Sequence, residues 1–155
     1  MKRFIGEFEE QSFTQIIFPH KDTDWVEYLA QAEETFINII HAISRYQKCF
    51  IICADITYVK SKFLDHHNLY FAEYQTDDTW ARDCSALSVE VDAEVKLLDF
   101  TFNAWGNKFN SSKDNAMSLA LQNIYLKDLE SVDFVLEGGA VESNGEGVLL
   151  TTSAC

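Results

Sequence analysis

Residues 76–83 read Thr-Asp-Asp-Thr-Trp-Ala-Arg-Asp, between an aromatic run at 69–71 and the strand-like segment 87–89. A solvated loop seldom needs a Trp. Successive side chains of an extended chain point to opposite faces, so Arg82 and Asp83 share a pocket only if the backbone bends between them. We expect one of them to face a functional site. The alternative is an Asp-rich turn closed by an Arg82 salt bridge, with Trp80 filling the core.

Strands and helices alternate before this octet. Strands are predicted at residues 13–18, 49–54 and 69–74, the first ending at the single proline, Pro19. A short helix is expected near residues 57–65. A long helix with caps from residues 22–24 is predicted between the first two strands, with Glu33 on its solvent side. Its apolar residues recur at helical spacing: Trp25, Tyr28, Leu29, Ala32, Phe36, Ile39, Ile40 and Ile43.

The alternation continues after the octet. Residues 84–91 and 95–102 are predicted to form an antiparallel pair, followed by an aromatic loop at 101–108. Ser111 or Ser112 is expected to cap a helix that extends to Ile124, before a strand at 132–136. A turn at 144–147 leads to a predicted buried strand at 148–152, where the chain looks like a fragment. The pattern predicts an α/β fold in one domain, residues 1–155.

Composition limits the function. With 155 residues, 47% hydrophobic and 14% aromatic, the chain can build a sizeable core. Its net charge of -13 repels nucleic acid and anionic membranes and attracts cations. A DNA mimic is an alternative, but the acids are scattered among apolar residues rather than gathered in a stripe. We therefore expect a cationic partner, with no nucleic acid and no membrane.

No signal peptide or membrane span is recognisable, so a cytoplasmic location is expected. Metal sites are not predicted either. The cysteines, at 49, 53, 84 and 155, include no Cys-x-x-Cys pair and no zinc-like spacing, which favours reduced thiols. Asp65, His66 and His67 are consecutive and cannot converge on one ion without a distorted backbone.

A second chemical feature is Glu137, which lies between an apolar strand and the pair Gly138-Gly139. Glycines allow a backbone to approach a bound group closely, although Gly-Gly pairs also mark simple turns. Asp83 and Glu137 together could hold a planar guanidinium through charge-assisted hydrogen bonds. Trp80 or Trp105 could stack on that cation or exclude water from it.

Three stretches together resemble one family. They are residues 76–83, residues 102–108 (Phe-Asn-Ala-Trp-Gly-Asn-Lys), and residues 134–139 (Phe-Val-Leu-Glu-Gly-Gly) with 145–152 (Gly-Glu-Gly-Val-Leu-Leu-Thr-Thr). In this combination the chain resembles the agmatine deiminase and bacterial peptidylarginine deiminase family, and residues 7–9 and 19–20 agree with the family's opening. Asn107 departs from a frequent Gly and Cys84 from the usual Thr, without touching either carboxylate.

The resemblance implies a pentein fold, a pseudo-fivefold α/β propeller, of which this chain would supply about the first half. It also implies hydrolysis without metal or cofactor. A cysteine thiolate attacks the guanidinium carbon, ammonia leaves, and water releases a carbamoyl product, which is N-carbamoylputrescine when agmatine is the substrate. Asp83 would hold the guanidinium nitrogens and Glu137 would orient the group, while Asp77, Trp80, Trp105 and Gly138 would bind substrate.

The family's His-x-Asp segment and nucleophilic Cys have no counterpart in this chain. His20, His41, His66 and His67 lack that pattern and are expected at the surface or an interface, and Cys155 is not expected to be the nucleophile. The chain alone is therefore expected to be inactive. Peptidylarginine as substrate and a noncatalytic cation-binding fragment are the alternatives, and a homo-oligomer is left open. The lack of a secretion segment favours a free amine such as agmatine.

Overall fold

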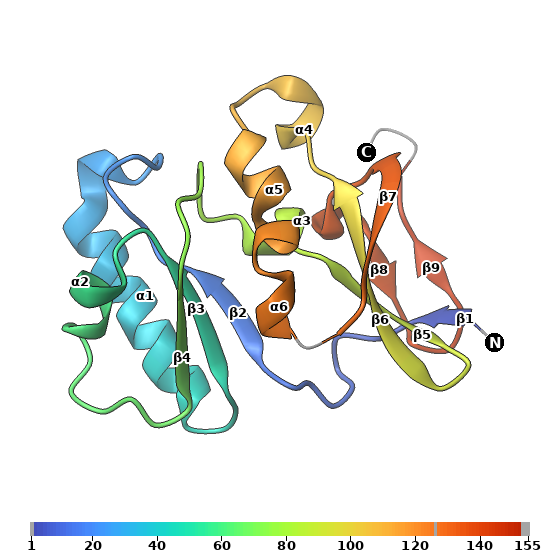
Figure 1. Ribbon diagram of the computed structural model, residues 1–155, viewed down its shortest axis with the longest axis horizontal. Helices are drawn as coiled ribbons and strands as arrows, with labels where there is room; N and C mark the ends of the chain where they lie inside the picture. Colours follow the sequence, from blue (N-terminus) through green and yellow to red (C-terminus); the bar gives the residue numbers. More distant parts are fainter. Residues whose placement is uncertain (1, 126, 153–155) are drawn as a thin grey trace. The chain divides into compact units, whose positions relative to one another are not determined.

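The computed structural model describes residues 2–125 and 127–152 and divides them into two compact units. One unit is formed by Gln11–Ala81 and is called unit 2 here. The other, unit 1, combines the N-terminal residues up to Glu10 with the chain from Arg82 onward. Both contain a sheet and helices (Figure 1), which confirms the mixed α/β class expected from the alternating pattern.

Unit 2 is built on a three-stranded parallel sheet in the order β2-β3-β4. Helix α1 packs against β3, and α2 packs against β4 (Figure 1). The elements are β2 (Thr14–Ile17), a 3₁₀ turn (Val26–Tyr28), α1 (Leu29–Ser44), β3 (Cys49–Cys53), α2 (Ile56–Lys60) and β4 (Leu69–Glu73). The three predicted strands are thus confirmed to within two residues.

The core of unit 2 lies between α1 and the sheet. All five residues of β3 are buried, as expected for a parallel central strand covered on both faces. The buried residues of this core are Phe18, Ile40, Cys49, Ile51, Cys53, Val59, Phe63 and Leu69. Truncating a fully buried member such as Ile40 or Ile51 to Ala would destabilise unit 2 by about 2–5 kcal/mol, since a cavity would remain.

Unit 1 contains a four-stranded sheet in the order β1-β5-β6-β7 and a separate hairpin, β8-β9. The predicted antiparallel pair is present as β5 and β6, and Asp92 and Ala93 form its turn with positive φ. The strands are β1 (Lys2–Phe4), β5 (Leu87–Val91), β6 (Glu94–Thr101), β7 (Leu129–Val135), β8 (Glu142–Ser143) and β9 (Leu149–Leu150). The helical segments are α3 (Ala81–Cys84), α4 (Ala104–Asn107), α5 (Ser112–Ala120), α6 (Gln122–Tyr125) and a 3₁₀ turn, Gly138–Ala140.

Two predictions about the long helix were wrong. It begins at Leu29 after the 3₁₀ turn, and no side-chain cap bonds its N-terminus, so residues 22–24 do not cap it. Glu33 is 7% exposed instead of facing solvent. Its carboxylate accepts hydrogen bonds from Tyr58 Oη and Lys62 Nζ, which a helical wheel of α1 alone cannot reveal.

Three boundaries in unit 1 also differ from expectation. Residues 84–86 precede β5 because the chain turns helical at α3, and the predicted helix at 111–124 is split into α5 and α6. Ser111 is the N-cap residue of α5, but its side chain makes no cap hydrogen bond. The expected buried strand at 148–152 was wrong: Val148, Leu149 and Leu150 are 53%, 52% and 67% exposed, since β9 pairs only with the two-residue β8.

No helix among the described residues is both long and apolar enough to cross a membrane. Cys155, expected not to be a nucleophile, lies outside the described residues.

Candidate active site

Asp83 lies on α3, one helical turn that supplies the bend expected between Arg82 and Asp83. The backbone N–H of Gly139 donates a hydrogen bond of 3.0 Å to Asp83 Oδ1. The two residues are 56 positions apart in the sequence, so this contact joins the octet to the Glu-Gly-Gly segment. Because it holds one carboxylate oxygen, the other remains available for an incoming N–H group.

The glycines after Glu137 are required by this contact. A Cβ on Gly138 would lie 2.3 Å from the carbonyl oxygen of Arg82, and a Cβ on Gly139 would lie 2.1 Å from Asp83 Oδ1. The sequence led us to expect that both glycines admit a bound group. The structure gives them a different role: they admit α3, and Gly138 is itself buried. Substrate binding by Gly138 stays a prediction.

Glu137 is a buried acid at the end of β7. Its side chain is 9% exposed, and its backbone carbonyl accepts a hydrogen bond from Ala140 N in the 3₁₀ turn. Within residues 2–125 and 127–152, neither Glu137 nor Asp83 forms an ion pair with a lysine or arginine. A carboxylate buried without a cation is costly, so this position favours a cationic ligand.

The two acids influence each other electrostatically. Burial raises the pKa of Asp83, and the Glu137 carboxylate raises it further; the Gly139 N–H and the Arg82 guanidinium act in the opposite direction. Like charges held close together relieve their repulsion by taking up a proton or a cation. The pair is therefore arranged to gain from a guanidinium, which carries charge and several N–H donors in one plane.

Arg82 does not close an Asp-rich turn. Its guanidinium pairs with Glu7 and donates a hydrogen bond of 3.1 Å to the carbonyl oxygen of Val141. Arg82 thereby connects the N-terminal segment to the chain that follows Glu137. The alternative interpretation of the octet, an internal salt bridge with Trp80 in the core, is wrong on both counts, because Trp80 is 49% exposed.

The aromatic loop contains an uncommon backbone. Residues 104–107 all have positive φ, from 50° at Ala104 to 85° at Gly106, and form one left-handed helical turn. Asn103 Oδ1 accepts a hydrogen bond from the N–H of Gly106. The indole of Trp105 packs edge-on against Phe102 and Phe109, with centroid distances of 5.4 and 5.9 Å. Asn tolerates the left-handed region better than most residues, which suits Asn107 to its φ of 59°.

Asp77 and Trp80 belong to unit 2, on the other side of the unit boundary from Asp83. Trp80 Nε1 donates a hydrogen bond of 2.9 Å to Asp78 Oδ2, and Trp25 Nε1 bonds Thr79 Oγ1 at 2.8 Å. These bonds order the segment within unit 2. Substrate binding by Asp77, Trp80 and Trp105 stays a prediction.

The described cysteines and histidines do not supply a nucleophile with its base. Burial raises the pKa of Cys84 far above its usual range and that of Cys49 to about 11, so these thiols stay protonated. His41, His66 and His67 are exposed, as expected. The described residues include no cluster of three or more potential metal ligands.

Sequence reasoning missed two residues that hold the chain after α3, Ser118 and Asp99. Ser118 is fully buried on α5, its Oγ accepts a hydrogen bond of 3.0 Å from Ala86 N, and its hydroxyl bonds Asp99 on β6. Burial raises the pKa of Asp99, and the Ser118 bond partly offsets this. The available signal was the position of Asp99 in β6, directly after Leu97-Leu98 and before Phe100. This network fixes the chain that leaves α3.

The chain matches the family model described as Porphyromonas-type peptidyl-arginine deiminase over residues 3–155. A Listeria monocytogenes relative named "Putative agmatine deiminase 1" is 31% identical over 160 residues, covering 99% of this chain and 44% of the relative. The chain thus spans less than half the length of that relative.

The chain is also similar to solved structures of agmatine deiminases. The C. jejuni agmatine deiminase is 39% identical with a TM-score of 0.91, over 100% of this chain and 47% of that one. A cysteine-to-serine variant of the C. jejuni enzyme with substrate bound gives a TM-score of 0.92 at 39% identity, over 97% of this chain and 45% of the other. The agmatine deiminase of Enterococcus faecalis is 29% identical with a TM-score of 0.87, over 97% and 43% of the two chains. From its sequence and its fold, the chain belongs to the Porphyromonas-type peptidyl-arginine deiminase family, which includes agmatine deiminase relatives.

Proposed function

We propose that this chain carries the guanidinium-binding acids of a deiminase that hydrolyses the C–N bond of agmatine to give N-carbamoylputrescine and ammonia. The observation that carries the proposal is the Asp83–Glu137 pair. One of these acids is half-buried and the other is 9% exposed, and neither forms an ion pair with a lysine or arginine among the described residues. A guanidinium would supply the missing positive charge and N–H donors to both.

The reaction requires groups that this chain does not supply. A thiolate would add to the guanidinium carbon, ammonia would leave with a proton, and water would then cleave the amidino thioether to regenerate the thiol. The nucleophile and a histidine base would come from the remainder of a longer polypeptide, since the relatives are more than twice as long as the matched region. In this scheme Asp83 and Glu137 bind and orient the substrate.

The complete fold would be a pentein, a propeller of five strand–helix modules, to which these residues contribute the first part. Support comes from the chain's α/β units and its TM-scores of 0.91 and 0.92 over about 45–47% of two agmatine deiminase chains. The names of the relatives favour agmatine, whereas the family model is described for peptidylarginine. A cytoplasmic location, which suits a free amine, and the oligomeric state stay predictions.

The decisive experiment measures ammonia release by the protein expressed from the full coding frame, with agmatine and an arginine-containing peptide as competing substrates. We expect turnover of agmatine and a large loss in Asp83→Asn. Equal turnover of the peptide would favour the peptidylarginine alternative. Binding of agmatine without ammonia release would favour the noncatalytic alternative, and no interaction with either compound would contradict both.

A further inference from the structure

Unit 2 contains a cavity of its own, with a volume of about 360 Å³. It lies beyond the carboxyl ends of the parallel strands β2, β3 and β4, where ligands commonly bind in open α/β sheets. All its lining residues belong to unit 2, whereas Asp83 and Glu137 belong to unit 1. Its volume is at the lower end of the range for small-molecule sites.

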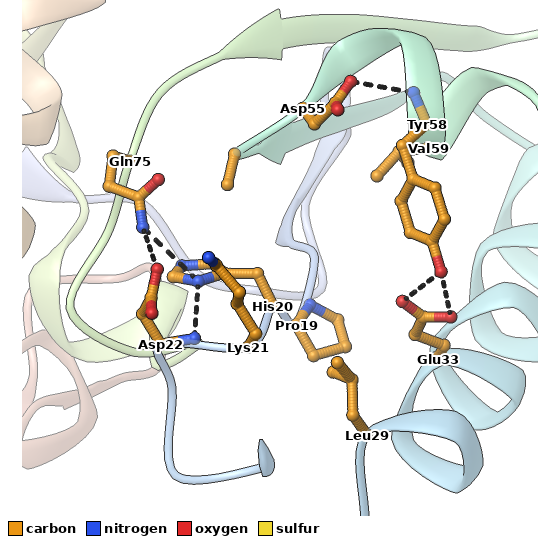
Figure 2. A pocket seen from close by; sticks show the side chains of 11 residues that line it. Pro19, His20, Lys21, Asp22, Leu29, Glu33, Asp55, Tyr58, Val59 and Gln75 are labelled. Carbon is orange, nitrogen blue, oxygen red and sulfur yellow. Dashed lines mark hydrogen bonds between the residues drawn. The ribbon is translucent and has the colours of Figure 1, made fainter.

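The cavity is lined by two groups of polar side chains and by several apolar residues. Figure 2 shows His20, Asp22 and Gln75 grouped on one side and Tyr58 and Glu33 on the other. The apolar residues of the lining are Pro19, Leu29, Ala54 and Val59. This arrangement suits a short aliphatic body with at least one polar end.

The hydrogen-bond donors on the Gln75 side are already used. The Asp22 N–H donates to His20 Nδ1, which places the proton of a neutral ring on Nε2, facing Thr76 Oγ1 at 3.2 Å. Gln75 Nε2 lies 3.4 Å from both His20 Nδ1 and Asp22 Oδ2. The Gln75 amide therefore directs its NH₂ group toward His20 and Asp22, and its Oε1 has no hydrogen-bond partner among the described residues.

The opposite side is also rich in acceptors. Tyr58 donates its hydroxyl proton to Glu33, at 3.0 and 3.1 Å from the two carboxylate oxygens, so its phenol oxygen can only accept. Glu33 is neutralised by Lys62 Nζ at 2.8 Å. Asp55 caps α2 with Oδ1, and its Oδ2 has no partner within the described part of the chain.

The charges of the lining residues also favour a ligand with N–H donors. After the Glu33–Lys62 pair is discounted, the lining carries the carboxylates of Asp22 and Asp55 against the single ammonium of Lys21. Lys21 is exposed and can extend into solvent. A ligand that supplies N–H donors and positive charge fits this surplus of acceptors, while a carboxylate or phosphate does not.

We propose that this cavity binds a small aliphatic ammonium ion, with its carbon chain against the apolar lining residues Pro19, Leu29 and Val59 and its N–H groups directed to Asp22, Gln75 and Asp55. The site is separate in composition from the guanidinium pair and does not depend on the proposed deiminase activity.

The test is an NMR titration of the ¹⁵N-labelled 155-residue chain with n-butylammonium chloride, with butan-1-ol and sodium butanoate as neutral and anionic isosteres. We expect saturable shifts at the Gln75 side-chain NH₂ and the backbone amides of His20 and Tyr58, with a Kd on the order of 1 mM. Equal shifts with butan-1-ol or butanoate would overturn the assignment of a cation. Absence of saturable shifts would overturn the site.

Variants separate the site from general electrostatics. The double variant Asp22→Asn/Asp55→Asn keeps the shape of both side chains and the helix cap, and should weaken n-butylammonium binding at least about fivefold. The matched control Glu27→Gln/Glu34→Gln removes the same charge from exposed positions of unit 2 and should leave Kd within about twofold. Equal weakening in both would refute the proposal, as would shifts centred on Gly139, which would place the ligand at Asp83 instead.

Discussion

Gly139 approaches Asp83 so closely that a single added methyl carbon would lie 2.1 Å from the carboxylate oxygen that its N–H binds. The neighbouring Gly138 meets the Arg82 carbonyl in the same way. The Glu-Gly-Gly segment therefore packs directly against α3, and these two segments supply the two acids, Glu137 and Asp83.

Loss of the Asp83 charge should abolish most guanidinium capture. In the complete protein, Asp83→Asn keeps the size of the side chain but removes charge-assisted hydrogen bonds, so kcat/KM should fall roughly 100-fold. Steady-state ammonia release measures this. The control Asp133→Asn removes the same charge from an exposed position on β7. Unchanged turnover in Asp83→Asn would show that this acid does not hold the substrate.

The stability of the chain should depend on the protonation of Asp83. Its folded pKa is raised by burial and by Glu137, so the folded state binds this proton more tightly than the unfolded state. The contribution is therefore favourable at low pH and is lost as pH rises through the raised folded pKa. Glu137→Gln should shift the Asp83 titration, followed by the Gly139 amide in NMR, toward the ordinary Asp value. An unchanged Asp83 titration in this variant would mean that the two acids do not interact.

The glycine requirement can be measured directly. Gly138→Ala should destabilise the chain by about 1–3 kcal/mol, because the Arg82 carbonyl belongs to the backbone and cannot move aside easily. Gly106→Ala is the comparison: it has φ +85° but open space around it, so only backbone strain of about 1 kcal/mol is expected. Urea unfolding measures both. A smaller effect at Gly138 than at Gly106 would contradict the close packing of α3.

The left-handed turn should favour residues that accept positive φ. Asn107→Gly should leave the free energy of unfolding unchanged or raise it by up to about 1 kcal/mol, whereas Asn107→Val should lower it by at least about 1 kcal/mol. Lys108→Val is the control, because Lys108 has φ -75°. If Asn107→Val and Lys108→Val have equal effects in thermal or urea unfolding, the turn is not left-handed in solution.

The buried acid of α1 depends on its lysine. Lys62→Met would leave the Glu33 carboxylate, 7% exposed, with only the Tyr58 hydroxyl, and should cost about 1–3 kcal/mol. Adding Glu33→Gln should recover part of the loss, because the uncompensated charge is then absent. Chemical denaturation of the single and double variants forms a double-mutant cycle. Strict additivity would show that the two groups do not interact.

Much of the fold was readable from local patterns. The buried strand β3 is a continuous apolar run, and the turn between β5 and β6 follows from two strand-like segments joined by a short polar link. Such features depend on residues close in sequence, because the spacing of apolar side chains along the chain indicates whether a segment forms a helix or a strand. The exposed β9 shows the limit, because an apolar segment is buried only when another element covers it.

The chain's residue types alone determined the chemistry of the candidate site: acids, glycines and aromatic residues at positions that match a deiminase family. Only the tertiary structure decided that Gly138 and Gly139 make room for α3, that Arg82 pairs with Glu7, and that Glu33 is buried beneath Tyr58. These contacts join residues from 25 to 75 positions apart, and no local pattern specifies which distant partner a charged side chain will meet. Burial and partner together set whether a carboxylate is free to bind a cation.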